Sequence, residues 1–214
     1  MRKKVSFLEH GYIFGILASI IGFMGYIIAL LLTPEYVMWK YTISYLGDLS
    51  GGIFLRGGLI ISNCLAIPFI IYLGRIVKND QINDIIRKFA VGIGIFTSVS
   101  AILTGSTYGA LHGIFALFAW IGSAFVCSLF GFLMVKSTKF SKQIVYFGYI
   151  LGGIIFFYLI PFFTTNFCNL YREICYSFGQ KIFLIMPTFE WIVIFGILFW
   201  YLSNSIYLIK RRST

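Results

Sequence analysis

Six long apolar runs constrain the fold of this chain more than any other feature of its sequence. Each run is long enough to cross a hydrocarbon layer of about 30 Å at a helical rise of about 1.5 Å per residue. A helix satisfies its own backbone hydrogen bonds, which lipid cannot do. The sequence therefore predicts an all-α membrane protein, a bundle of about six transmembrane helices forming one domain over residues 1–214. The expected spans are approximately 11–33, 53–74, 89–107, 109–135, 143–163 and 182–209.

The composition agrees with this prediction. Hydrophobic residues make up 59% of the 214 residues and charged residues 11%, whereas a soluble domain averages about 25% charged residues. A small globule has too little interior to hide so much apolar surface, so lipid must cover much of it. The first run is too long for a signal peptide and has no cleavage site of small residues, so no cleavable signal is expected.

The net charge of +10 has a topological explanation. Lysine and arginine cluster at the ends of the apolar runs rather than on one surface, which argues against nucleic acid as a partner and favours membrane lipids. Thirteen of these residues fall in the N-terminal segment, in 75–88, in 136–142 and in the C-terminal segment. By the positive-inside rule, both termini and these two loops are expected in the cytoplasm. The opposite side receives only Lys40, Arg56, Arg172 and Lys181.

Small and polar residues recur at helical spacing within the runs. The first and third runs each carry a polar face, which should turn inward, and glycines four residues apart favour close helix packing. The hydroxyls of the third run have two possible partners: polar groups on other helices or the carbonyls of their own helix. The polar faces are Tyr12, Ser19, Tyr26 and Thr33, and Thr97, Ser100, Thr104 and Thr107; the glycines are Gly105, Gly109 and Gly113, and Gly148 and Gly152.

Four ionisable residues lie near the ends of runs on the same predicted outer side: Asp48, Arg56, His112 and Glu190. Insertion of a charged side chain into the membrane is unfavourable by about 2.5–3.5 kcal/mol even on lenient scales. Such residues are therefore expected to be paired with another group, hydrated or functional. A histidine beside a carboxylate can act as an acid–base pair, which makes His112, Glu190 and Asp48 candidate catalytic residues.

The same region supplies candidate ligand-binding residues: Arg56, Asn63 and Ser44. Arginine can hold a phosphate or carboxylate group. We therefore expect an outward-facing polar pocket for a lipid headgroup or another small ligand. No metal site and no cofactor are expected, because histidine is too scarce here and no ligand-spaced or phosphate-binding motif is present.

Each ionisable residue also has an ordinary structural interpretation. Asp48 could cap a turn, Arg56 could extend to headgroups, and His112 could be an interfacial histidine. Glu190 depends on where the last helix begins. A start near Lys181 places Glu190 deep in the hydrocarbon, in need of a partner, whereas a start at Pro187 places it in a first turn that the helix dipole stabilises.

Two cysteines share the last outer connection. Cys168 and Cys175 lie on a side of the membrane where thiols tend to oxidise, so we predict a disulfide between them; a free pair or a metal-binding pair is the alternative. Cys64 and Cys127 lie within runs and are interpreted as packing residues.

Several short motifs follow one another along the chain: the stretch Ile43–Asp48, the pair Ile53 and Phe54, the stretch Gly57–Ile61, Gly105 followed by His112 and by Phe115 and Ala116, and Glu190 ahead of Trp200. In these the chain resembles a prokaryotic membrane protein family known as domain of unknown function 998. The resemblance covers most of the chain and implies about six helices, an outward-facing polar cluster and the prokaryotic plasma membrane, but no reaction.

Two departures from the family pattern concern the candidate site. Glu190 is followed by Trp191 where the family often has arginine, and Tyr108 is followed by Gly109 where the family often has proline. Arg56 or His112 is therefore the expected partner of an ionised Glu190.

Three functions remain open. The first is a protein that binds lipid or headgroups, with or without catalysis. The second is an accessory subunit of a membrane complex, or a self-associating protein, which the short loops and the 20% aromatic content would suit. The third is a small transporter, which would need polar groups from one face of the membrane to the other.

Overall fold

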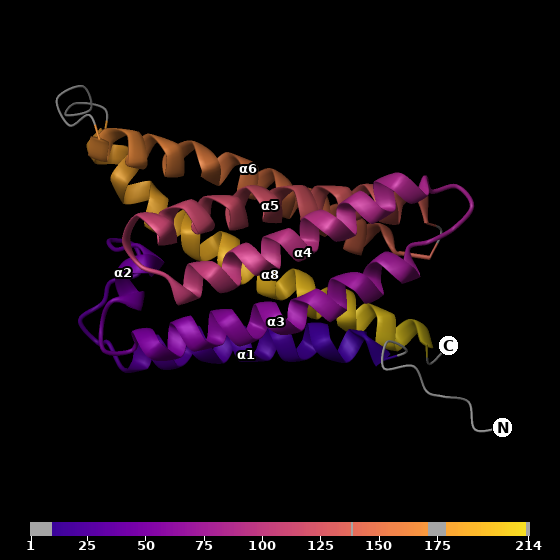
Figure 1. Cartoon of the computed structure of the whole chain (residues 1–214), viewed down its shortest axis with the longest axis horizontal. Helices are drawn as coiled ribbons and strands as arrows, with labels where there is room; N and C mark the ends of the chain where they lie inside the picture. Colours follow the sequence, from indigo (N-terminus) through magenta and orange to yellow (C-terminus); the bar gives the residue numbers. More distant parts are fainter. Residues whose placement is uncertain (1–9, 138, 171–178, 213–214) are drawn as a thin grey trace.

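The computed structural model describes residues 10–137, 139–170 and 179–212 (Figure 1). Side chains are described for all of these residues except 165–170, 179–184 and 212. The described part is all-helical. Six of its helices are long and apolar enough to cross a membrane, as expected of a multi-pass membrane protein. The helices are α1 (Tyr12–Leu31), α2 (Ile43–Gly47), α3 (Gly52–Ile76), α4 (Asp84–Ser106), α5 (Gly109–Lys136), α6 (Lys142–Leu170) and α8 (Gly179–Arg212).

The six long helices form a closed ring. Helix α1 packs on α3, α3 on α4, α4 on α5, α5 on α6, α6 on α8, and α8 packs back on α1. The outer faces of the ring carry large exposed apolar side chains such as Ile20, Phe96 and Phe156, which lipid would cover. The predicted all-α bundle and its six spans are therefore confirmed.

The short helix α2 was not expected. It lies in the connection between α1 and α3 and packs against both of them and against α8. Its Leu46 is fully buried and Ile43 is 5% exposed. Helix α2 therefore covers one end of the ring, which we call the α2 end (Figure 1).

The remaining connections sort to the two ends of the bundle. The turn between α4 and α5 lies at the α2 end, and Gly109 makes it possible with a φ of 59°, a conformation that glycine adopts without strain (Figure 1). The connections after α3 and α5, the start of α1 and the end of α8 lie at the opposite end. We call this the basic end, because it carries Arg75, Lys78, Arg87, Lys88, Lys136, Lys139, Lys142, Lys210 and Arg211.

The polar faces of the helices turn inward, as predicted. The hydroxyls of Thr97 and Thr104 in α4, and of Thr107 directly after it, donate to carbonyls four residues earlier, at 2.7–2.8 Å. The own-helix alternative is therefore the correct one for these threonines. Pairing between helices occurs elsewhere. Ser19 of α1 donates to the Leu198 carbonyl of α8 at 2.8 Å.

Candidate functional site

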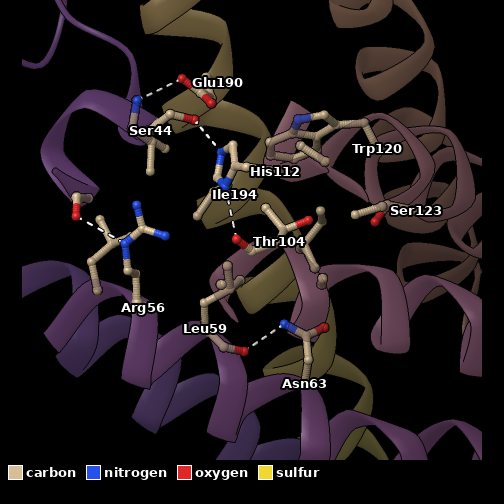
Figure 2. Close-up of a pocket in the computed structure, with 18 of the residues that line it drawn as sticks. Ser44, Arg56, Leu59, Asn63, Thr104, His112, Trp120, Ser123, Glu190 and Ile194 are labelled. Atoms are coloured by element: carbon tan, nitrogen blue, oxygen red, sulfur yellow. Dashed lines mark hydrogen bonds between the residues drawn. The ribbon is translucent and has the colours of Figure 1, made fainter. Parts of the chain in front are cut away.

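A cavity of about 330 Å³ lies inside the ring, and all six long helices and α2 contribute to its wall. Its lining is mostly apolar, and its polar side chains lie both at the α2 end, as Glu190 and His112 do, and deeper in the ring, as Asn63 and Ser123 do (Figure 2). Gly109 and Gly113 of α5 line it and are themselves exposed, which places an opening beside the first turns of α5. The polar lining includes Ser44, Arg56, Asn63, Thr104, His112 and Glu190; the apolar lining includes Leu59, Ala116, Trp120, Ile194 and Leu198.

The ring of His112 connects two elements that are distant in sequence. Its Nε2 lies 2.9 Å from the Ser44 Oγ of α2, and its Nδ1 lies 2.9 Å from the Thr104 carbonyl oxygen of α4 (Figure 2). A carbonyl oxygen can only accept a hydrogen bond, so Nδ1 must carry a hydrogen. In the neutral ring Nε2 is then the acceptor, and the Ser44 hydroxyl donates to it.

Glu190 forms its hydrogen bond with Ile43, the first residue of α2, and not with His112. Its Oε2 accepts a hydrogen bond from the Ile43 backbone N–H at 2.8 Å, and the residue is 5% exposed. Helix α8 begins at Gly179, so Pro187 lies inside it and Glu190 is three turns from its start. The opening-turn alternative is therefore wrong. The expectation that Arg56 or His112 pairs with Glu190 is also wrong in the geometry described, because the backbone amide of α2 takes that place.

Arg56 holds the last residue of α2. Its Nε donates to the Gly47 carbonyl at 3.1 Å, and its Nη2 donates to Asp48 Oδ1 at 2.7 Å. Its Nη1 donates to the Thr107 carbonyl at 2.9 Å, and the guanidinium lies 4.0 Å from the centre of the Tyr108 ring. Arg56 thus ties α2 to the turn between α4 and α5, and its side chain is 12% exposed.

Helix α2 is consequently fixed at both ends. Glu190 accepts from its first amide and Arg56 donates to its last carbonyl. Its backbone lacks the length to be stable alone, since isolated short helices are marginal in water. The position of Ser44 therefore depends on the side chains of Glu190 and Arg56, which belong to α8 and α3.

Five of the six residues predicted for the site meet at one cavity: Ser44, Arg56, Asn63, His112 and Glu190. Asp48 does not line it. The Asp48 side chain is 60% exposed and pairs with Arg56, so it does not form an acid–base pair with His112 in this structure. Asn63 lines the cavity while its amide donates to the Leu59 carbonyl of its own helix at 2.9 Å.

Sequence reasoning missed the partners that orient His112. It noted Thr104 for its hydroxyl, whereas the site uses the Thr104 carbonyl, which no side-chain pattern marks. The sequence predicted Ser44 as a ligand-binding residue, but it did not predict that Ser44 contacts His112. The eight-residue separation of Thr104 and His112 across a tight turn was the one available signal.

Two chemical expectations concern cysteines and metals. Cys168 and Cys175 lie outside the described side chains, and the described part of the chain contains no disulfide; there, Cys64 and Cys127 are free thiols. Within the same part, no three histidine, cysteine, aspartate or glutamate residues cluster as metal ligands would.

Comparison with known proteins adds no relative. No family model matches the chain, so its resemblance to domain of unknown function 998 stays a prediction. No curated protein and no solved structure matches it either. The proposed function below therefore rests on the geometry of the cavity.

Proposed function

We propose that the protein binds a lipid, or another amphipathic small molecule, inside its ring of helices. The observation that carries this proposal is a single cavity whose wall is mostly apolar but carries Ser44, His112 and Glu190 at the α2 end. Its volume of about 330 Å³ falls at the lower end of the range of about 300–1,000 Å³ for ligand pockets. An acyl chain would lie against Leu59, Ala116 and Ile194, and the polar part of the ligand would lie near Ser44 and His112.

The charges at the α2 end favour a hydrogen-bonding group over a strongly anionic one. The positive charge of Arg56 is matched by Asp48 at 2.7 Å, and Glu190 adds a carboxyl group. The other polar side chains of the lining are mostly hydroxyls, such as those of Ser44 and Thr104, together with the imidazole of His112 and the amide of Asn63. Such a set suits the ester and hydroxyl region of a lipid better than an isolated phosphate.

The proposal includes an orientation, in which the basic end faces the cytoplasm and the cavity opens toward the outer side. Support comes from the lysine and arginine residues at that end and the positive-inside rule. In a variant without native cysteines, Lys40→Cys should react with a membrane-impermeant maleimide in intact cells, whereas Lys78→Cys should react only after permeabilisation. The reverse pattern would overturn the orientation without affecting the cavity.

Ligand binding can be tested with a phospholipid that carries a diazirine and an alkyne on one acyl chain. After irradiation of the purified protein, we expect crosslinks on cavity residues such as Trp120 and Ile194. The change Gly113→Phe should reduce these crosslinks about tenfold or more, because Gly113 lines the cavity and faces open space where a side chain can enter.

The matched control is Gly153→Phe. Gly153 also faces open space, but it does not line the cavity, so its crosslinking should equal that of the unchanged protein. Crosslinks confined to outward-facing residues such as Phe118 and Phe156, and insensitive to Gly113→Phe, would refute a lipid site. The accessory-subunit function would then be the better explanation.

A further inference from the structure

The hydroxyl of Ser44 has a different partner from the serine and threonine hydroxyls that bond to backbone carbonyls along the long helices. Those of Ser62, Thr104 and Ser106 donate to backbone carbonyls, which take a hydrogen bond but cannot remove a proton. Ser44 Oγ instead lies 2.9 Å from a histidine nitrogen. An imidazole nitrogen can accept the proton completely, which is how a serine becomes a nucleophile.

The histidine is oriented for that role. The Thr104 carbonyl accepts from Nδ1–H at 2.9 Å, which fixes the ring and keeps the lone pair of Nε2 directed at Ser44. A nucleophile in hydrogen-bond contact with a base, and a base oriented by a third group, is the arrangement of nucleophilic acyl transfer. Here the third group is a backbone carbonyl and not a carboxylate.

The pair also lies at a chemically appropriate place in the cavity. Ser44 and His112 lie in the cavity wall with Glu190 beside them, and the apolar side chains of Trp120 and Ile194 lie further along α5 and α8 (Figure 2). In a lipid, the ester carbonyl has the same position, between the polar headgroup and the acyl chain. A ligand bound as proposed above would therefore present an ester to Ser44.

We propose that Ser44 is a catalytic nucleophile and His112 its general base, and that the protein cleaves an acyl ester of the amphipathic ligand in the cavity. This inference rests on the proposed binding function and adds a reaction to it. Glu190 and Arg56 are positioning residues, because they fix the two ends of α2.

The reaction proceeds in two steps. Ser44 Oγ bonds to the ester carbonyl carbon while His112 Nε2 takes the hydroxyl proton. The bond to the alcohol oxygen then breaks, and that oxygen receives the proton from His112, which leaves an acyl-serine. In the second step a water molecule gives a proton to His112 and bonds to the acyl carbon. The bond to Ser44 breaks, the proton returns to Ser44, and a carboxylic acid is released.

The test uses the purified full-length protein and an alkyl fluorophosphonate, in which an activated serine attacks phosphorus and displaces fluoride. We expect one phosphonylated serine per chain, mapped by mass spectrometry to Ser44. The change His112→Gln should slow labelling about 100-fold or more, as expected for loss of a general base. Ser44→Ala should abolish it.

Ser50→Ala is the matched control, because Ser50 lies six residues away in the same connection and donates to a backbone carbonyl, that of Leu32, at 2.8 Å. Its labelling should equal that of the unchanged protein. If His112→Gln fails to fold, the site labelled in the unchanged protein still decides whether Ser44 is the reactive serine. Labelling at other serines, or at Ser44 with no dependence on His112, would refute the nucleophile.

The diazirine phospholipid measured on the same preparation separates the two proposals. Cavity crosslinks without labelling of Ser44 would refute the catalytic pair and keep the binding function. Labelling of Ser44 without cavity crosslinks would keep the nucleophile and refute lipid as its ligand. Release of free fatty acid from an unmodified phospholipid, lost in Ser44→Ala, would establish turnover.

Discussion

The change Arg56→Leu is expected to destabilise the folded protein by about 2–4 kcal/mol. It leaves the carbonyls of Gly47 and Thr107 without their donor, and an unpaired buried polar group costs about 1–3 kcal/mol. It also removes the contact of the guanidinium with the Tyr108 ring. The measurement is thermal unfolding in detergent, compared with the unchanged protein.

Two comparison variants make this prediction specific. Arg75→Leu changes an exposed arginine at the other end of the same helix and should shift stability by no more than about 0.5 kcal/mol. Arg56→Lys keeps the charge but cannot reach all the acceptors of the planar guanidinium. Its loss of stability should therefore lie between those of Arg56→Leu and Arg75→Leu. Equal losses in Arg56→Leu and Arg75→Leu would show that Arg56 does not hold α2.

Arg56 also gives a functional readout that a purely structural role would not change. Well below the unfolding temperature, fluorophosphonate labelling of Ser44 should be slower in Arg56→Leu, because the last residue of α2 is no longer fixed. Labelling at an unchanged rate in the folded variant would mean that α2 keeps Ser44 in place without Arg56.

The second large effect concerns two adjacent glycines of α3. Gly58→Ala is expected to lower stability by about 1–3 kcal/mol, because its new methyl group would lie 2.8 Å from the Gly25 Cα of α1, and two helix backbones would have to separate. Gly57→Ala is expected to raise stability by up to about 1 kcal/mol. Its methyl group meets open space, and alanine favours the helix over glycine.

Both variants add the same atoms to neighbouring positions of one helix, so each controls for the other. Thermal unfolding in detergent should give shifts of opposite sign. A similar decrease in both variants would indicate that glycine flexibility in α3, and not the close contact with α1, is what matters.

Much of the architecture could be predicted from the sequence because lipid imposes a simple rule. Each span must be long, apolar and helical, so the six runs marked the long helices to within a few residues in most cases, as for 109–135 against Gly109–Lys136. The last two helices extend further than expected at the α2 end: α6 continues to Leu170 and α8 starts at Gly179. The additional turns contain fewer strongly apolar residues, so hydropathy could not mark them.

The members of the site were also partly predictable, because ionisable residues near membrane spans are costly and therefore few. Arg56, His112 and Glu190 were selected for that reason, and all three line the cavity. Their partners could not be predicted in the same way. Glu190 bonds to a backbone amide and His112 to a backbone carbonyl, and every residue has such groups, so the sequence carries no mark of which are used.

The sequence by itself determined an all-helical chain with six membrane-spanning helices and a short set of polar residues at one end of them. Only the tertiary structure decided that the helices close into a ring, that the short helix α2 folds over one end, and that Ser44 meets His112 there. The physical reason is the separation along the chain over which each interaction acts. Hydrophobicity acts on each helix separately, whereas the Ser44–His112 contact joins residues 68 positions apart and depends on how every helix between them packs.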